Sequence, residues 1–235
     1  MKILAFDTST AQGSVAVLED DLVLSERVWR RERSHSEFLT SEIQEALKEA
    51  SVKIAAIDAL AVGQGPGSFT GIRVAINAAR SLGYALAKPV SVFETSEILA
   101  HPINRFDLPV LSVLNAQKNS YFVSRFTRKN DCWIRTDDVA LLTLKELEGR
   151  LTEAHLCVGD GCTEAEARLS PDLKSVWVRD SVISDYPLAS SLGALTFIYR
   201  DSRGPIVWNA VQPLYLRASG AEETLREKLA EVSKR

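Results

Sequence analysis

The chain has 235 residues, of which 46% are hydrophobic and 25% are charged, and its formal net charge is −3. This composition predicts a globular protein with a sizeable core, built as one large domain or as two small lobes. The slight negative net charge argues against a protein that binds nucleic acid mainly through its own electrostatic attraction. We therefore expect any contact with RNA to be shared with a partner protein.

The cysteines and the hydropathy pattern indicate the cellular compartment in which the protein works. Cys132, Cys157 and Cys162 are odd in number and form no C-x-x-C motif, which disfavours a disulfide framework and a zinc knuckle. No stretch approaches about 18 uninterrupted apolar residues, and the opening residues look like a strand rather than an export signal. We therefore expect a cytoplasmic protein without a membrane partner.

The N-terminal third begins with a predicted strand at residues 2–6, which runs into the polar turn D-T-S-T at residues 7–10. Residues 14–18 and 22–28 predict two further strands joined by a hairpin. An aspartate at the end of a first strand, followed by hydroxyl residues, could hold a hydrated metal ion or receive a phosphate. The alternative is that Asp7 only forms hydrogen bonds within the turn.

The densest glycine cluster is L-A-V-G-Q-G-P-G-S-F-T-G, at residues 60–71. Its apolar start predicts a strand, and the apolar spacing of three and four over residues 70–87 predicts a helix after it. Glycines at such a junction let backbone N–H groups converge at the positive end of the helix, where a phosphate or carboxylate can bind. The alternative is a tight turn that only permits close packing. The loop lacks the Walker A ending and the dinucleotide fingerprint spacing, which disfavours ordinary nucleotide-binding folds.

The turn after the first strand and the glycine cluster together give the candidate anion- or nucleotide-binding residues, which are Asp7, Thr8, Ser9, Gly65, Gly67 and Ser68.

Two more elements complete the first half. Ser34 and Glu37 match a capping box, which predicts a helix from residue 35, and residues 90–92 predict a strand. The resulting order β-β-β-α-β-α-β predicts an α/β lobe with a mixed sheet flanked by helices.

The second half repeats part of this pattern. Residues 110–114 and 121–126 predict a strand, a polar turn and a returning strand. Thr143 and Glu146 predict a second capping box ahead of a short helix, and residues 155–158 predict another strand.

The prolines within residues 102–109 mark a boundary between the halves. We expect an N-terminal lobe over residues 1–103, a C-terminal lobe over residues 104–220 and a solvated tail over residues 221–235. The run V-Q-P-L-Y-L-R at residues 211–217 is expected to lead out of the fold.

Four stretches together resemble a known family. They are the opening I-L-A-F-D-T-S-T, the helix start S-H-S-E-F-L, the loop A-V-G-Q-G-P-G-S-F-T-G-I-R and the late P-L-Y-L-R. In this order they resemble the TsaB family, also called YeaZ, and the resemblance covers nearly the whole chain. It implies two lobes of the actin-like, ribonuclease H-like type, each with a mixed sheet flanked by helices.

The resemblance also implies a function. The family takes part in forming N6-threonylcarbamoyladenosine, next to the anticodon of tRNAs that read codons beginning with A. There the paralogue TsaD carries the metal and transfers the threonylcarbamoyl group, TsaB pairs with TsaD as a non-catalytic partner, and the ATPase TsaE joins them. The implied partners are thus a TsaD-like and a TsaE-like protein, a second copy when the chain is alone, and tRNA only through the complex. No cofactor is required by the chain itself, and ATP or ADP could bind in the assembled complex.

By the same resemblance, the helices over residues 34–50 and 70–87 would build the interface with TsaD. Small side chains on the second helix would permit close approach, and an aromatic side chain on the first would serve as an anchor. The expected interface residues are Phe38, Leu39, Arg73, Ala75, Ile76, Ala79 and Gly83.

The departures from the catalytic paralogue matter for activity. Catalytic members carry an H-x-x-x-H pair after the strand that corresponds to residues 90–92, because two imidazoles one helical turn apart can hold one metal ion. Phe93 and Glu97 take those positions here, and phenylalanine cannot coordinate a metal. In the second lobe Asn115 stands where the superfamily often has an aspartate. We therefore expect no metal site and no enzymatic activity.

Two other functions are weighed against this one. An ATP-dependent small-molecule kinase or ATPase of the same superfamily would use Asp7 as a metal–water ligand and the loop at residues 65–71 for phosphate, and Asn115 counts against it. A metal-dependent peptidase is disfavoured because the histidine pair is missing.

Overall fold

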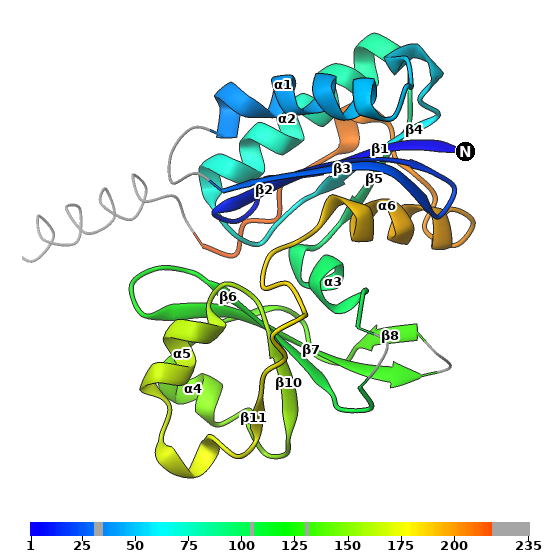
Figure 1. Ribbon diagram of the computed structural model, residues 1–235. Coiled ribbons are helices and arrows are strands. Elements are labelled where there is room, and N and C mark those ends of the chain that lie inside the picture. Colours follow the sequence, from blue (N-terminus) through cyan, green and yellow to red (C-terminus); the bar gives the residue numbers. More distant parts are fainter. Residues whose placement is uncertain (31–34, 104–105, 130–131, 218–235) are drawn as a thin grey trace, which may run out of the picture.

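The computed structural model describes residues 1–30, 35–103, 106–129 and 132–217, and the side chains of residues 35–37 are outside that description. Two β-sheets lie one above the other, each with helices packed against it (Figure 1). Within the described residues, no helix is both long and apolar enough to cross a membrane.

The first sheet has the strand order β3-β2-β1-β4-β5. The β1–β2 and β2–β3 pairs are antiparallel, whereas the β1–β4 and β4–β5 pairs are parallel, so the sheet is mixed. Its strands are β1 (Lys2–Asp7), β2 (Gln12–Glu19), β3 (Leu22–Arg30), β4 (Ala59–Gly63) and β5 (Val90–Phe93).

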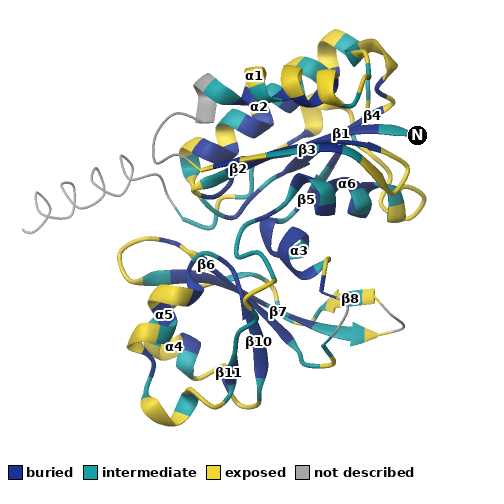
Figure 2. Cartoon of the chain, viewed as in Figure 1, coloured by how far each residue is buried: buried dark blue, intermediate teal, exposed yellow. Residues whose placement is uncertain are grey.

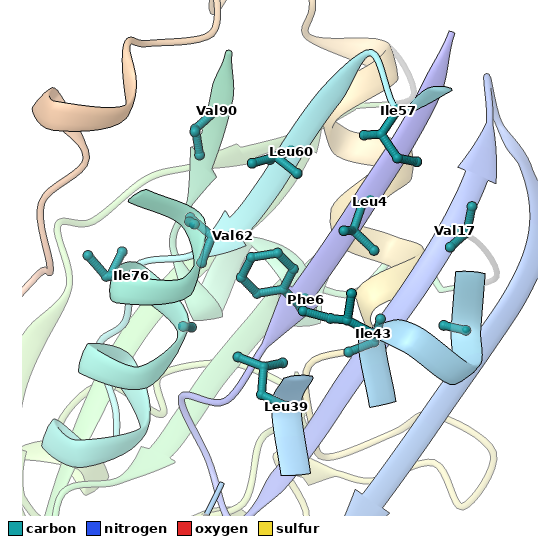
Figure 3. Close-up of a cluster of buried hydrophobic side chains, with 14 of the residues drawn as sticks. Leu4, Phe6, Val17, Leu39, Ile43, Ile57, Leu60, Val62, Ile76 and Val90 are labelled. Carbon is teal, nitrogen blue, oxygen red and sulfur yellow. The ribbon is translucent and has the colours of Figure 1, made fainter. Parts of the chain in front are cut away.

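Helices cover both faces of this sheet because β1 is apolar on both sides. Leu4 and Phe6 point to the face that α1 (His35–Glu49) and α2 (Phe69–Leu86) cover, and Ile3 and Ala5 point to the face that α6 (Ala189–Ile198) covers. Figure 3 shows side chains of β1 and β4 gathered with those of α1 and α2 in the larger core.

The second sheet has the order β11-β10-β6-β7-β8, and β9 also pairs with β7. Parallel pairs join β6, β10 and β11, and the remaining pairs are antiparallel. Its strands are β6 (Val110–Asn115), β7 (Ser120–Lys129), β8 (Cys132–Arg135), β9 (Ala140–Thr143), β10 (His155–Val158) and β11 (Trp177–Val178).

Helices also cover this second sheet on both faces. Side chains of α4 (Leu144–Glu148) and α5 (Cys162–Arg168) pack on one face, and α3 (Thr95–Ala100) packs on the other, toward the first sheet (Figure 1). The central strands of both sheets are buried, whereas the edge strands β3, β8 and β9 and the outer surfaces of the helices are mostly half-buried or exposed (Figure 2). Short 3-10 helices lie at Ile54–Ala56, Pro171–Leu173 and Trp208–Ala210.

The predicted fold class, α/β with two mixed sheets flanked by helices, is confirmed. The capping box at Thr143 and Glu146 is also present, with the Thr143 side chain accepting from the N–H of Glu146 and the Glu146 side chain accepting from the N–H of Thr143. The predicted cap at Ser34 and the tail over residues 221–235 lie outside the described residues.

Two segments of the second half lie against the first sheet, although residues 104–220 were expected to form the C-terminal lobe. The helix α6 packs on β1 and β2 because Ala189, Leu192 and Leu195 are buried with their side chains. The expectation that residues 211–217 lead out of the fold is wrong. They belong to a segment at residues 206–217, here called the C-terminal strap, which returns to α2.

The C-terminal strap begins at Ile206, which forms an antiparallel bridge with Val90 of β5. It continues beside α2, where the buried Val211 packs in the core and its carbonyl oxygen accepts two hydrogen bonds from the Arg80 guanidinium, at 3.0 and 2.6 Å. It ends at Arg217, which donates to the carbonyl oxygen of Ala116 in the second half. The strap therefore connects the two sheets through contacts at both of its ends.

Candidate functional site

The turn after β1 is closed by its own hydrogen bonds. The N–H and the hydroxyl of Ser9 both donate to Oδ1 of Asp7, at 2.9 and 2.8 Å. The hydroxyl of Thr95, at the start of α3, in turn donates to the Ser9 oxygen at 2.9 Å. Asp7, Thr8, Ser9 and Thr95 are all fully buried, so none of these side chains is open to solvent.

The second carboxylate oxygen of Asp7, Oδ2, is buried without a hydrogen-bond partner. A Cβ atom added to Gly63 would lie 1.7 Å from this oxygen, so glycine is required there. Burial raises the pKa of Asp7 to about 6, against the hydrogen bonds from Ser9, which lower it. The site therefore holds a carboxyl group that takes up a proton more readily than an exposed one.

The glycine loop, defined as residues 63–71, packs directly on this turn. The N–H of Ser68 donates to the carbonyl oxygen of Ser9 at 2.7 Å, and the hydroxyl of Thr8 donates to the carbonyl oxygen of Gly71 at 2.7 Å. The N–H of Gly71 donates to the hydroxyl of Ser68, which caps α2. A phosphate at a helix N-terminus needs such backbone N–H groups. Here the N–H groups of Ser68 and Gly71 already bind atoms of the chain itself.

The outer side of the glycine loop is bound by two other segments. The N–H of Leu214 in the C-terminal strap donates to the carbonyl oxygen of Gln64 at 2.8 Å. The N–H of Thr95 donates to the carbonyl oxygen of Gly65 at 2.9 Å. The loop is therefore held between the turn after β1, the start of α3 and the strap.

The structure thus brings most of the predicted anion-binding residues together. Gly67 approaches Ser9 so closely that an added Cβ would lie 2.1 Å from its carbonyl oxygen, and Ser68 binds the same oxygen. Gly65 instead faces Ile72 and the carbonyl oxygen of Leu214. Nucleotide binding by this group stays a prediction.

The positions that carry histidines in the catalytic paralogue have structural contacts here. Phe93 is buried against α6, with its ring centroid 6.2 Å from that of Tyr199. The carboxylate of Glu97 accepts from the N–H of Glu94 at 3.1 Å and pairs with Arg203 at 2.8 Å. Over the described ranges, no three His, Cys, Asp or Glu side chains are grouped so that they could hold a metal ion. These residues do not fit the metal of the paralogue.

Asn115 ends β6 in a network of polar contacts. Its side-chain amide donates to Glu164 at 3.1 Å, its side-chain oxygen accepts from the N–H of Gln117 at 2.7 Å, and its own N–H donates to Asp160 at 2.9 Å. Burial raises the pKa of Asp160 to about 6, while the hydrogen bond from Asn115 lowers it. Asn115 therefore connects the first turn of the second sheet to α5.

The residues expected at the dimer interface divide into two groups. Phe38 is half-buried and Arg73 is exposed. The other five lie in the interior of the chain, where Gly83 packs against Trp208 and Val90. They are Leu39, Ala75, Ile76, Ala79 and Gly83.

The outward face of α2 carries a different set of residues. Its two charged residues are the exposed Arg73 and the half-buried Arg80. The Arg73 guanidinium lies 3.9 Å from the ring centroid of Phe69, and its Nε donates to the Tyr215 hydroxyl at 2.9 Å. The rings of Phe69 and Tyr215 stack at 4.7 Å. The exposed residues that the sequence prediction missed are Thr70, Asn77, Ser81, Tyr84 and Ala85. With Arg73, four of them (Thr70, Asn77, Ser81 and Tyr84) follow a spacing of three and four opposite the apolar stripe, which was the signal that could have found them.

Comparison with known proteins gives the family. A family model described as tRNA N6-adenosine threonylcarbamoyltransferase, TsaD, matches residues 23–151. The chain is 30% identical over 167 residues to the tRNA threonylcarbamoyladenosine biosynthesis protein TsaB of Buchnera aphidicola from Schizaphis graminum, covering 68% of this chain and 78% of that protein.

Two other relatives extend the comparison. The Bacillus subtilis TsaB is 28% identical over 130 residues, which cover 55% of this chain, so the chain spans 57% of the length of that relative. A solved Pseudomonas aeruginosa structure, described as an uncharacterized protein with similarity to peptidase YEAZ, superposes with a TM-score of 0.78 at 26% identity and covers 92% of this chain and 99% of its own. By the family model and the Buchnera relative together, the chain belongs to the TsaB (YeaZ) family.

Proposed function

We propose that the chain is a non-catalytic subunit in the formation of N6-threonylcarbamoyladenosine in tRNAs that read codons beginning with A. It binds a TsaD-like transferase and works with a TsaE-like ATPase. The names of its TsaB relatives support the pathway, and the match of residues 23–151 to the TsaD family model supports a common origin with the transferase. The chain touches tRNA only within the complex.

The proposal that the chain is non-catalytic rests on one observation, the hydrogen bonds that join the turn after β1 to the glycine loop. The 2.7 Å hydrogen bonds from Ser68 to Ser9 and from Thr8 to Gly71 occupy the place where a phosphate would need free donors. Phe93 and Glu97 serve in core packing and in helix capping. The transfer chemistry therefore belongs to the partner.

The outward face of α2 is the surface that we assign to the partner. Its two charged residues, Arg73 and Arg80, are bound to Tyr215 and to Val211 of the C-terminal strap. The remaining exposed side chains are small or uncharged, and depletion of charge is typical of the centre of protein interfaces. The helix α1 contacts α2 and extends this surface, and Phe38 of α1 is a partly buried side chain packed against the core. The same face would serve a homodimer when the chain is alone.

Reconstitution tests this proposal. The chain is combined with a TsaD-like protein, a TsaE-like ATPase, the synthase that makes threonylcarbamoyl adenylate, and unmodified tRNA, and the modified adenosine is quantified by mass spectrometry. We expect product only when the chain is present. We expect Asn77→Arg, on the outward face of α2, to abolish product and co-elution with the TsaD-like protein. The charge change Lys145→Glu, on exposed α4, is the matched control and retains both.

The outcomes separate the possible roles. Product that is independent of the chain would overturn the proposed function. If product formation needs the chain but is unaffected by Asn77→Arg, the partner binds a surface other than the outward face of α2. Asp7→Asn is expected to leave the yield unchanged, because the partner performs the transfer.

One observation favours the alternative of an ATP-dependent kinase or ATPase. The unpartnered Oδ2 of Asp7 is a buried carboxylate oxygen at the end of β1, where that superfamily places a ligand of metal-bound water. Titration of the isolated chain with ATP and Mg²⁺, followed by calorimetry, distinguishes the two functions. Tight binding with turnover would favour the kinase and would exclude a purely structural subunit.

A further inference from the structure

A small pocket lies on the second sheet, at the place where β7 changes its edge partner. β9 pairs with β7 up to Val123, and β8 pairs with it from Phe126 onward, so residues 136–139 leave the sheet between these strands. The pocket has a volume of about 160 Å³, and Gly149, Arg150 and Thr152 of the segment after α4 are part of its lining. It is separate from the glycine loop and from the outward face of α2.

The floor of the pocket is apolar. Leu111 of β6, Val123 of β7, and Ala140 and Leu142 of β9 line it. Leu111 and Val123 are buried side chains of the core beneath α4 and α5. This floor favours a ligand with an aliphatic group of small size.

One wall of the pocket is Arg125, and its guanidinium is fixed from behind. Nε donates to Nε2 of His155 at 3.2 Å, and Nη2 forms an ion pair with Glu153. His155 is fully buried, and its Nδ1 lies 2.7 Å from the carbonyl oxygen of Glu153. Burial lowers the pKa of His155, so the ring is neutral and its Nε2 accepts the bond from Arg125. A guanidinium has five N–H groups, so Arg125 can bind a ligand carboxylate in addition to Glu153 and His155.

Acidic groups line the pocket beside Arg125, because the N–H of Thr136 donates to the Arg125 carbonyl oxygen at 2.9 Å and Asp137 and Asp138 come next in the chain. Asp137 pairs with Arg150 at 2.8 Å, and both of these residues line the pocket. Asp138, the next residue, also lines the pocket and is exposed. These carboxylates disfavour the binding of a ligand that carries only negative charge. They suit a ligand that places a cationic group near them and an anionic group near Arg125.

Size and charge together define the ligand. Pockets for drug-sized molecules span roughly 300–1,000 Å³, so this pocket is too small for a nucleotide. We propose that it binds a free amino acid with a short aliphatic side chain. The carboxylate binds Arg125, the ammonium group binds Asp138, and the side chain lies on Leu111, Val123 and Leu142. This binding is independent of the proposed partnership with a transferase.

Calorimetric titration of the full chain tests the proposal. The probes are glycine, L-alanine, L-valine and L-leucine, each at concentrations up to about 10 mM, which suits a weak site. The capped forms N-acetyl-L-valine and L-valinamide lack the ammonium and the carboxylate respectively. We expect saturable binding of at least one aliphatic amino acid, and at least about tenfold weaker binding of both capped forms, because each loses a charge-assisted hydrogen bond.

Variants assign the contacts. Arg125→Gln and Asp138→Asn are each expected to weaken binding at least about tenfold, and Lys145→Gln, on the exposed surface of α4, is expected to leave it unchanged. Because Asp138 is exposed, its variant keeps the test valid even if Arg125→Gln perturbs folding. Absence of saturable binding by all four amino acids would overturn the proposal. Equal binding of the capped forms, or unchanged binding by Asp138→Asn, would overturn it as well.

Discussion

The hydroxyl of Thr8 donates to the carbonyl oxygen of Gly71 at 2.7 Å, across a separation of 63 residues in the chain. This bond joins the end of β1 to the first turn of α2, and it brings the two backbones into direct contact. A Cβ atom at Gly71 would lie 1.8 Å from the carbonyl oxygen of Thr8, and backbone atoms cannot yield as a flexible side chain can.

Gly71→Ala is therefore expected to lower the free energy of unfolding by more than about 2 kcal/mol, because the turn and the helix must separate. Urea denaturation followed by circular dichroism measures this change. Gly149→Ala, where an added Cβ would be 3.4 Å or more from its neighbours, is the control and should change stability by less than about 1 kcal/mol. Equal effects of the two variants would contradict the close contact.

Asp7 is expected to make stability depend on pH. Its pKa is raised from 3.8 to about 6 in the folded chain, so between these values the folded state binds a proton that the unfolded state has released. The stabilisation from protonated Asp7 is complete below about pH 4 and is lost as pH rises through about 6, up to a total of about 3 kcal/mol.

Asp7→Asn removes this titration. Stability of the native chain relative to Asp7→Asn should fall as pH is raised from about 4 to about 7, as measured by urea denaturation at each pH. Asp160 has a similarly raised pKa, but it is present in both proteins and cancels from the difference. A difference that does not vary with pH would show that Asp7 titrates normally.

Tyr215 is expected to fasten the C-terminal strap to α2. Tyr215→Ala removes the ring stacked on Phe69 and the hydroxyl that accepts from Arg73, and should lower the free energy of unfolding by about 1–2 kcal/mol. Tyr215→Phe keeps the stacked ring and should cost less than half as much. A double-mutant cycle with Arg73→Ala measures the coupling, and a coupling of zero would refute the contact.

The three cysteines are expected to react differently with a thiol reagent. Cys132 is exposed, whereas Cys157 and Cys162 are buried. Burial raises the pKa of both buried thiols, which suppresses the reactive thiolate. Titration with a chromogenic disulfide should therefore modify one thiol per native chain and three after denaturation. Fast modification of more than one native thiol would contradict this burial.

Much of the architecture could be predicted because local signals agreed with the final packing. The apolar run of β1, the glycines before α2 and the capping box at Thr143 each act within a few residues and lie where expected. Long-range contacts were harder to predict. The course of the C-terminal strap depends on Val211 entering the core beside α2, and no periodicity within residues 206–217 indicates that contact.

The candidate site was predicted in part for a related reason. The sequence predicts Asp7 and the glycine loop as one group of candidate anion-binding residues, and the parallel pairing of β1 with β4 brings the two together. The sequence could not show that Ser9 and Thr8 would occupy the loop's donors and acceptors. On α2, the spacing of Ala75 and Ala79 indicates an apolar stripe, but an apolar stripe has the same pattern whether it meets the chain's own sheet or another protein.

The contacts of the C-terminal strap also determine which parts of the fold can form first while the chain is being synthesised. Arg80 bonds to the carbonyl oxygen of Val211, which is synthesised 131 residues later, and Arg73 bonds to Tyr215, which is synthesised 142 residues later. While the ribosome is still adding the second half, the side of α2 that the strap will cover is bare, and β5 lacks its bridge to Ile206. The first half can collapse early, but its final packing is postponed until the strap has left the exit tunnel.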